Sequence, residues 1–292
     1  MSAIAPPIRA EFERALEPLA DIAPERPLAA TGRLARQPVL RKGLIVVVLA
    51  VLWECAARLA GNDLLFPTFT QTARAWMADV ASGELPAKAW ISLTLLLQGY
   101  AIGIVVAFFF TALAISARIG RDLLSTLTLM FNPLPAIALL PLALLWFGLG
   151  KASLIFVLVH SVLWPLSLNT FAGFQGVPET LRMAGRNYGL RGLRGLRLTL
   201  SILVPSALPA ILSGLRIGWA FAWRTLIAAE LFFGASSGQG DLGWYIFQNR
   251  NELYTDRVFA GLATVILIGM LVENLVFDTI ERVTVRRWGV QR

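Results

Sequence analysis

Four side chains that could do chemistry lie inside long apolar stretches of the 292-residue sequence. Arg216, Arg224 and Glu230 fall within one stretch, and His160, the only histidine, falls within another. An arginine near the centre of a lipid bilayer costs about 2.5–3.5 kcal/mol on insertion scales, so each one calls for a reason. Its guanidinium group presents a planar fork of N–H donors that suits sulfonate, nitrate or carboxylate oxygens. An arginine in such a stretch could therefore contact an oxyanion.

No set of residues in the sequence suggests an active site. One histidine and one cysteine exclude a Cys/His zinc site, and the single histidine argues against most hydrolytic arrangements. Cys55 lies within an apolar run and is interpreted as a small core residue. In WFGLGKAS, Leu145 stands where a phosphate-binding P-loop needs Gly, and Ala152 where it needs Ser or Thr. We therefore expect this chain to be non-catalytic and to bind no nucleotide, metal or other cofactor itself.

The spacing of the intramembrane charges limits how they can pair. Arg216 and Arg224 are eight residues apart, which leaves them about 80° apart on one broad face of a helix. Glu230 lies about 120° around from Arg224, so partners should come from other helices. We hypothesise that Arg224 lines a solute path; the alternative is a structural charge bonded to a neighbouring helix, and Arg216 could simply snorkel. The candidate residues of the path are Arg224, Arg216, His160 and Glu230.

Other polar residues in the apolar runs have structural interpretations. His160 and Asn169 are more typical of hydrogen bonds between membrane helices. Glu54 and Arg58 have the favourable i, i+4 order and predict an ion pair on one helix. The stretch GASSGQGDLGWY, residues 234–245, could be an outer gate or an ordinary loop.

The elements that must position these residues are apolar helices. The sequence is 57% hydrophobic and 15% charged, and a helix needs about 20 apolar residues to span a bilayer. Prolines in the third and fourth runs favour helices buried in a bundle, because neighbours must satisfy the freed backbone groups. Thr70–Val80 predicts a helix along the membrane surface. We predict an all-α, polytopic membrane protein with about six spans: Leu44–Ala60, Trp90–Ser116, Leu123–Phe147, Ala152–Phe174, Ala207–Phe233 and Val258–Ile280.

The net charge of +8 is a topology signal. Of 26 Lys and Arg residues, 18 lie in residues 1–43, 117–122, 175–205 and 282–292. Because basic residues favour the cytoplasmic side, we expect a multi-pass inner-membrane protein with both termini cytoplasmic, and no nucleic-acid partner. The expected parts are a cytoplasmic tail at 1–42, a membrane domain at 43–285 with a cytoplasmic loop at 175–205, and a C-terminal tail at 286–292.

The loop segment from Pro178 to Pro209 combines five Arg with four Gly. Pro178 suits the start of a helix and Gly189 the position just past its end. Leu181, Ala184 and Tyr188 would share one face of this helix, while Arg182 and Arg186 lie on another. Such a helix could anchor the protein to anionic lipid or dock onto a cytoplasmic partner.

The segment resembles the cytoplasmic EAA loop of ABC-importer permeases, whose pattern is E-A-A-x3-G-x9-I-x-L-P. Met183-Ala184-Gly185 stands at E-A-A, Gly189 at the Gly and Val204-Pro205 at the closing pair. The sequence departs from the pattern at Met183, although Glu179 lies one turn earlier, and it carries three extra residues after Gly189. PLP (Pro133–Pro135), LLPLALLWFGLGK (Leu139–Lys151), the stretch Pro205–Leu231 and GDLGWYI (Gly240–Ile246) extend the resemblance over about residues 44–285, most closely to permeases for nitrate, sulfonate, taurine and bicarbonate.

The resemblance implies a MetI-like, type I importer fold in which two permease copies, normally identical, pair. It implies two cytoplasmic ABC ATPase subunits, which hold ATP and Mg, and an extracytoplasmic solute-binding protein. It also implies alternating access for a small anion such as a sulfonate, taurine or nitrate. The coupling residues by this resemblance are Glu179, Arg182, Met183, Ala184, Gly185, Arg186, Tyr188 and Gly189.

An ion-gradient-driven secondary transporter or channel is the alternative function. It would account for the spans and the intramembrane arginines, but not for a basic docking helix in the longest internal cytoplasmic loop. An integral membrane enzyme would need a cluster of acids or histidines at one interface, which the sequence lacks.

Overall fold

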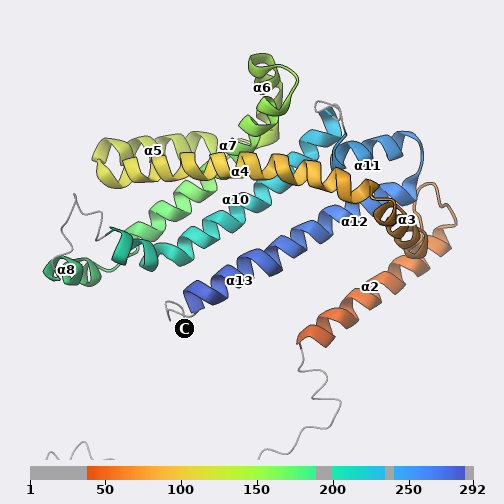
Figure 1. The fold of residues 1–292 in the computed structure, drawn as a ribbon, viewed down its shortest axis with the longest axis horizontal. Coiled ribbons are helices and arrows are strands. Elements are labelled where there is room, and N and C mark those ends of the chain that lie inside the picture. The colour runs from red at the N-terminus through yellow and green to blue at the C-terminus, as the bar shows by residue number, and fades with distance from the viewer. Residues whose placement is uncertain (1–37, 189–198, 234–239, 287–292) are drawn as a thin grey trace, which may run out of the picture. The chain divides into compact units, whose positions relative to one another are not determined.

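The computed structural model describes residues 38–188, 199–233 and 240–286, and every regular element in these ranges is helical (Figure 1). The chain divides into two compact units, Met1–Leu52 and Trp53–Arg292. The all-α, polytopic fold class is confirmed. The long apolar helices are Leu40–Ala60, Glu84–Ser116, Lys151–Gln175, Thr199–Leu231 and Thr255–Val285, with Arg118–Phe131 and Ala136–Phe147 as a bent pair.

Both expected tails fall largely outside the described residues. Helix α2 (Pro38–Ala60) already contains residues 38–42, so the first helix begins before the expected boundary at residue 43. Its side chains from Leu40 to Leu52 are mostly exposed and almost all apolar beyond Lys42, as lipid-facing positions require. Cys55 is exposed as well, so the prediction of a core residue was wrong for this chain.

The second unit begins with an aromatic cluster around Trp53. The Trp53 ring stacks on Phe66 at 6.3 Å and also contacts Phe69 and Phe259. Its indole N–H donates to the carbonyl of Pro67 at 3.0 Å. The cluster fixes the end of α2 against the start of α3 (Phe69–Ala81) and against α12 (Thr255–Leu271).

The range of α3 confirms the helix predicted at Thr70–Val80. Side chains on both sides of its first residue fix where it begins. Thr68 and Gln71 form a capping box, in which each side chain accepts a hydrogen bond from the other residue's backbone N–H. Glu54 accepts from the backbone N–H of Thr70 at 3.0 Å. Arg58 donates to the same carboxylate at 2.8 Å, which confirms the predicted ion pair and adds a role in capping.

The core is built from α4 (Glu84–Ser116), α7 (Lys151–Gln175) and α10 (Val204–Phe233). Figure 1 shows α4 passing across α7 and α10, and α7 contacts both of the other helices. Small residues allow the close approach. A Cβ at Gly103 would lie 2.8 Å from Val162, and one at Gly214 would lie 2.9 Å from Asn169.

The contacts of α7 also give the directions of the helices. Gly99 and Gly103 of α4 meet Leu158 and Val162 of α7 in the same order, so the two helices run parallel. Residues 117–150 must therefore return to the end at which α4 began. α5 (Arg118–Phe131) packs along α4, and α6 (Leu140–Phe147) continues toward the start of α7 (Figure 1). The bent pair is therefore the candidate for a sixth span.

The third span, expected at Leu123–Phe147, is broken in the structure. α5 ends at Phe131, a 3₁₀ turn occupies Ala136–Leu139, and the two halves meet at 89°. Pro133 and Pro135 cause the break, because proline donates no backbone hydrogen bond and clashes with the preceding turn. Buried Ser153 of α7 donates to the carbonyls of Ala143 and Gly148 at the far end of α6.

The last elements are α11 (Leu242–Asn251), α12 and α13 (Asp278–Glu281), with π-helical turns at Val272–Phe277 and Arg282–Arg286. Together α12 and α13 extend the span expected at Val258–Ile280 by several residues at both ends. Tyr245 of α11 donates to the buried Asp79 of α3, which also pairs with Arg257 of α12 at 3.6 Å. This contact ties three elements together. Burial, together with the hydrogen bond to Asp79, raises the pKa of Tyr245, which stays a neutral donor.

Candidate functional site: a cavity at the broken third span

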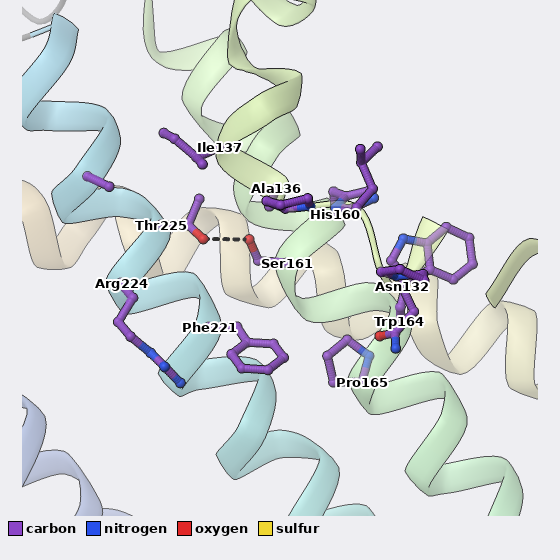
Figure 2. Close-up of a pocket in the computed structure, with 14 residues that line it drawn as sticks. Asn132, Ala136, Ile137, His160, Ser161, Trp164, Pro165, Phe221, Arg224 and Thr225 are labelled. Atoms are coloured by element: carbon purple, nitrogen blue, oxygen red, sulfur yellow. Dashed lines mark hydrogen bonds between the residues drawn. The ribbon is translucent and has the colours of Figure 1, made fainter. Parts of the chain in front are cut away.

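A cavity of about 370 Å³ opens where the break in the third span meets the middle of α7 and of α10 (Figure 2). The prolines of the break form one wall, and side chains of the two helices form the others. Its lining residues are Asn132, Pro133, Leu134, Pro135, Ala136, Ile137, His160, Ser161, Trp164, Pro165, Phe221, Arg224, Thr225 and Ala228.

Arg224 supplies the positive charge of this cavity. Its Nε donates to the carbonyl of Ala220 one turn earlier, at 3.0 Å. Its guanidinium carbon lies 5.2 Å from the centre of the Phe221 ring, which holds the side chain by a cation–π contact. Among the described residues no carboxylate pairs with it. The charge is therefore held in place but not neutralised.

Two of the lining residues on α7 carry buried nitrogen atoms that lack partners. Within the described part of the chain, both ring nitrogens of His160 and the indole nitrogen of Trp164 are buried without a hydrogen bond. The His160 ring lies against Phe131 and Trp164 instead. The predicted interhelical hydrogen bond of His160 is thus not formed within the described residues.

Two further polar residues shape the cavity. Ser161 of α7 and Thr225 of α10 are joined by a 3.2 Å hydrogen bond between their hydroxyl oxygens (Figure 2). Asn169 donates to the carbonyl of Pro165 in its own helix, so its predicted hydrogen bond to another helix is not found among the described residues. Pro165 places its ring at the cavity wall and interrupts the backbone bonding of α7.

Arg216 lies outside the cavity, in a cluster with the last helix. Its Nε is 2.9 Å from Glu273 and its Nη2 is 3.2 Å from Glu281. Its guanidinium carbon lies 5.8 Å from the centre of the Phe277 ring. The interhelical partners expected for the intramembrane arginines are therefore found for Arg216, whereas Arg224 has none among the described residues.

Glu230 also lies outside the cavity, at the far end of α10. Only 1% of its surface is exposed. Its Oε2 accepts from the hydroxyl of Ser92 at 2.8 Å and from the backbone N–H of Gly243 at 3.0 Å. Gly243 belongs to α11, and Asp241 caps the start of that helix by accepting a hydrogen bond from the backbone N–H of Trp244. Two carboxylates thus hold the N-terminus of α11, where the helix dipole favours negative charge.

The helix of the basic loop is α8 (Glu179–Asn187), preceded by Pro178 as expected. Met183 and Tyr188 are exposed, and Gly185 is buried against the rest of the protein. Arg186 lies 3.8 Å from Glu179. Gly189, expected at the end of the helix, lies outside the described residues.

Arg182 has a role that the sequence did not indicate. Its Nη2 donates to the carbonyl of Phe174 at 2.6 Å and its Nε to that of Val177 at 3.4 Å. The side chain therefore turns back from α8 and satisfies carbonyls at the end of α7.

The family described as the binding-protein-dependent transport system inner membrane component matches residues 99–290. This chain belongs to that family. The permease is 31% identical to the taurine transport system permease protein TauC of Escherichia coli, over 82% of this chain and 86% of the relative. It is also 31% identical to the putative aliphatic sulfonates transport permease protein SsuC of Escherichia coli, over 78% and 84%. The nitrate import permease protein NrtB of Synechocystis is 27% identical, over 82% and 86%.

Membership of the family decides between the classes of function that the sequence left open. The chain is a multi-pass membrane permease component of the ABC type, and its fold is MetI-like. A family of transport permeases implies a non-catalytic chain, as the sequence predicted. This membership argues against a gradient-driven transporter or channel and against a membrane enzyme.

Residues of the cavity that the sequence analysis missed are Asn132, Ser161, Trp164 and Thr225. The signal that could have found them is the Pro133–Pro135 pair. A break at membrane depth is tolerated only where it is covered by protein or lines a cavity, so polar residues beside it were candidates. The pairing of Ser161 with Thr225 could not be inferred, because it depends on how α7 and α10 lie against each other.

Proposed function

We propose that this permease moves a small oxyanion, of the sulfonate, taurine or nitrate type, through the cavity at Arg224. The observation that carries the proposal is the guanidinium of Arg224, which lines a 370 Å³ cavity, is held by Ala220 and Phe221, and has no carboxylate partner among the described residues. Arginine N–H groups bind planar and tetrahedral oxyanions well. The printed names of the relatives, which concern taurine, sulfonates and nitrate, support this class of solute.

A second permease copy would complete the path. Arg224 and Phe221 are exposed at the open side of the cavity, together with Ile217 one turn earlier on α10. An exposed arginine between apolar side chains at membrane depth is costly against lipid, whereas a second copy would enclose it. A homodimer with the cavity at or near its axis is the assembly that we propose.

In this proposal α8 receives mechanical work from an ATPase subunit. The helix leaves Met183 and Tyr188 exposed, with 86% of the Tyr188 surface accessible, on a segment that resembles a coupling loop. ATP and Mg would be bound by two partner ATPase subunits, and a binding protein would deliver the solute on the other side. ATP binding would shift a two-state equilibrium between inward-open and outward-open forms through its contacts with α8. Both termini would then be cytoplasmic.

Charge placed on the exposed positions of α8 tests the coupling role. In the reconstituted transporter, Met183→Asp and Tyr188→Asp are expected to reduce both the amount of copurifying ATPase and ATP-dependent uptake. Thr180→Asp is the matched control, because it adds the same charge at an exposed position in the first turn, where a carboxylate suits the helix dipole. If both test variants retained full ATPase association and full uptake, α8 would not be the coupling element.

A further inference from the structure

A second cleft, of about 380 Å³, lies at the end of the helix bundle where α8 is found. It shares no lining residue with the cavity at Arg224. Ile115 and Gln175 lie at the ends of α4 and α7, and Leu203 lies just before α10. Because these are the ends of three membrane-spanning helices, the cleft sits at the depth of the bilayer interface.

Two arginines from different helices line this cleft. Arg121 comes from the first turn of α5 and Arg182 from α8. Arg182 is oriented by its bonds to the carbonyls of Phe174 and Val177, which do not neutralise its charge. Its ion pair with Glu179 is long, at 3.8 Å, and largely exposed. Arg121 forms no ion pair within the described part of the chain.

The rest of the lining is mainly apolar. Ile115, Phe171, Phe174 and Leu203 form the walls, and the amide of Gln175 is the other polar group. A site with two cationic groups and an apolar wall at the interface fits a molecule with a phosphate and a hydrocarbon part. Basic pockets between membrane helices on the cytoplasmic side are typical sites for anionic lipid headgroups.

We propose that this cleft binds the phosphate group of an anionic phospholipid between Arg121 and Arg182. The phosphate would accept hydrogen bonds from both guanidinium groups, and the first part of an acyl chain would lie against the apolar wall. Free inorganic phosphate has the same charged group but no part that could use this wall. The lipid is therefore the ligand that the whole lining fits.

Such a ligand would act on the position of α8. Arg182 is the residue of α8 that contacts the end of α7, and the phosphate would join it to Arg121 of α5. An occupied cleft would therefore hold α8 against two membrane helices. If α8 transmits work from an ATPase, as the proposed function has it, anionic lipid would strengthen the coupling between ATP hydrolysis and uptake.

Native mass spectrometry of the purified full-length permease, delipidated and then incubated with phosphatidylglycerol or phosphatidylcholine, tests the binding. We expect selective retention of phosphatidylglycerol by the wild type, and about fivefold weaker retention by Arg121→Gln, the factor that corresponds to roughly 1 kcal/mol per basic residue at a membrane surface. Arg118→Gln is the matched control: Arg118 is exposed on the same helix and does not line the cleft. Arg182→Lys keeps a charge while changing the geometry, so it should weaken retention without unfolding α8.

The outcomes separate the possible ligands. Loss of retention in Arg121→Gln but not in Arg118→Gln, with no competition by millimolar inorganic phosphate, supports the lipid site. Effective competition by inorganic phosphate would overturn the assignment of a lipid ligand and would indicate a site for a free anion. Equal retention in wild type and Arg121→Gln, or equal loss in both variants, would refute the site. No ATPase is present in this measurement. Its result therefore does not depend on whether α8 couples the permease to an ATPase.

Discussion

Arg216 Nε lies 2.9 Å from Glu273 Oε1, which joins α10 to the π-helical part of the last span. Glu273, Phe277 and Glu281 follow one another at intervals of four residues. In a regular α-helix the first and last of these would be about 80° apart, and the wider π-helical turn reduces this angle. All three side chains therefore reach the same guanidinium.

This arrangement predicts unequal effects of charge removal on stability. Glu273→Gln and Glu281→Gln should each have a small effect, because Arg216 keeps one carboxylate partner in either variant. Arg216→Gln should cost more, because it leaves two carboxylates near each other without a counter-charge. Thermal unfolding in detergent measures the effect on stability. When both Glu273→Gln and Glu281→Gln are already present, Arg216→Gln should destabilise the protein much less, because no carboxylate is left without a counter-charge. Equal stability of Arg216→Gln and Glu273→Gln would contradict the shared pairing.

Replacement of Arg224 tests the proposed solute path. Hydrogen bonds to charged groups contribute about 1.5–3 kcal/mol, so Arg224→Gln should lower uptake of an anionic solute by roughly 10- to 100-fold. Arg224→Lys should have an intermediate effect, because the charge remains while the planar fork is lost. Uptake into proteoliposomes with the partner subunits is the measurement, and unaltered basal ATPase activity shows that the variant complex is assembled. Unchanged uptake with unchanged anion preference would exclude this role.

Gly243 is predicted to be essential for the packing of α11 on α10. A Cβ there would lie 2.3 Å from the Cβ of Glu230 and 3.0 Å from the nitrogen of Leu231. Gly243→Ala should therefore cost about 1–3 kcal/mol, as is typical of overpacking, and lower the unfolding temperature. Gly150→Ala is the control, since nothing lies within 4 Å of its Cβ position and its backbone is extended. Similar stability of the two variants would show that α11 can shift without cost.

Asp241 predicts a pH dependence of stability outside the membrane spans. Burial raises the pKa of this carboxyl above its ordinary value of 3.8, although the hydrogen bond from Trp244 N–H and the charge of Lys88 act in the opposite direction. The folded state therefore favours the protonated form. This contribution to stability is fullest below the ordinary pKa and is lost as pH rises through the folded-state pKa.

Unfolding temperatures between about pH 4 and pH 7 measure this dependence. Asp241→Asn keeps an oxygen that can cap Trp244 and removes the titration, so it should flatten the profile and stabilise the protein at neutral pH. Asp122→Asn, at an exposed position in α5, should leave the profile as in the wild type. A steeper rather than flatter profile for Asp241→Asn would contradict the assigned direction.

The sequence predicted the positions of the helices better than the contacts between them. Apolar runs located five long helices, and Pro178 located the start of α8, because hydropathy and capping are local properties. The prolines at 133 and 135 indicated a disturbed third span but not an 89° bend, since the direction depends on packing. One partner of Glu230 is Ser92, 138 residues away, and one partner of Arg216 is Glu281, 65 residues away. Such pairs follow from the tertiary arrangement alone.

In the candidate cavity, too, the sequence indicated a single residue but not the residues that surround it. Arg224 could be selected because charge is costly in a bilayer, whereas the other walls come from segments 60 to 90 residues earlier in the chain. His160 was expected to bond another helix, and its nitrogens instead remain without partners in the described part of the structure. A pattern of residue types gives no sign of which polar atoms stay unsatisfied.

The glycine contacts on both sides of α7 limit how the permease can change shape. At Gly99, Gly103 and Gly214 there is no space for even one added methyl group without displacing a neighbour. Sliding of α4 or α10 along α7 by a fraction of a turn would bring larger side chains into those positions. These contacts therefore favour movement of the three helices together as one unit. If the proposed homodimer changes between two access states, the bend at residues 132–139 and the contact between the two copies are the places where we expect the change.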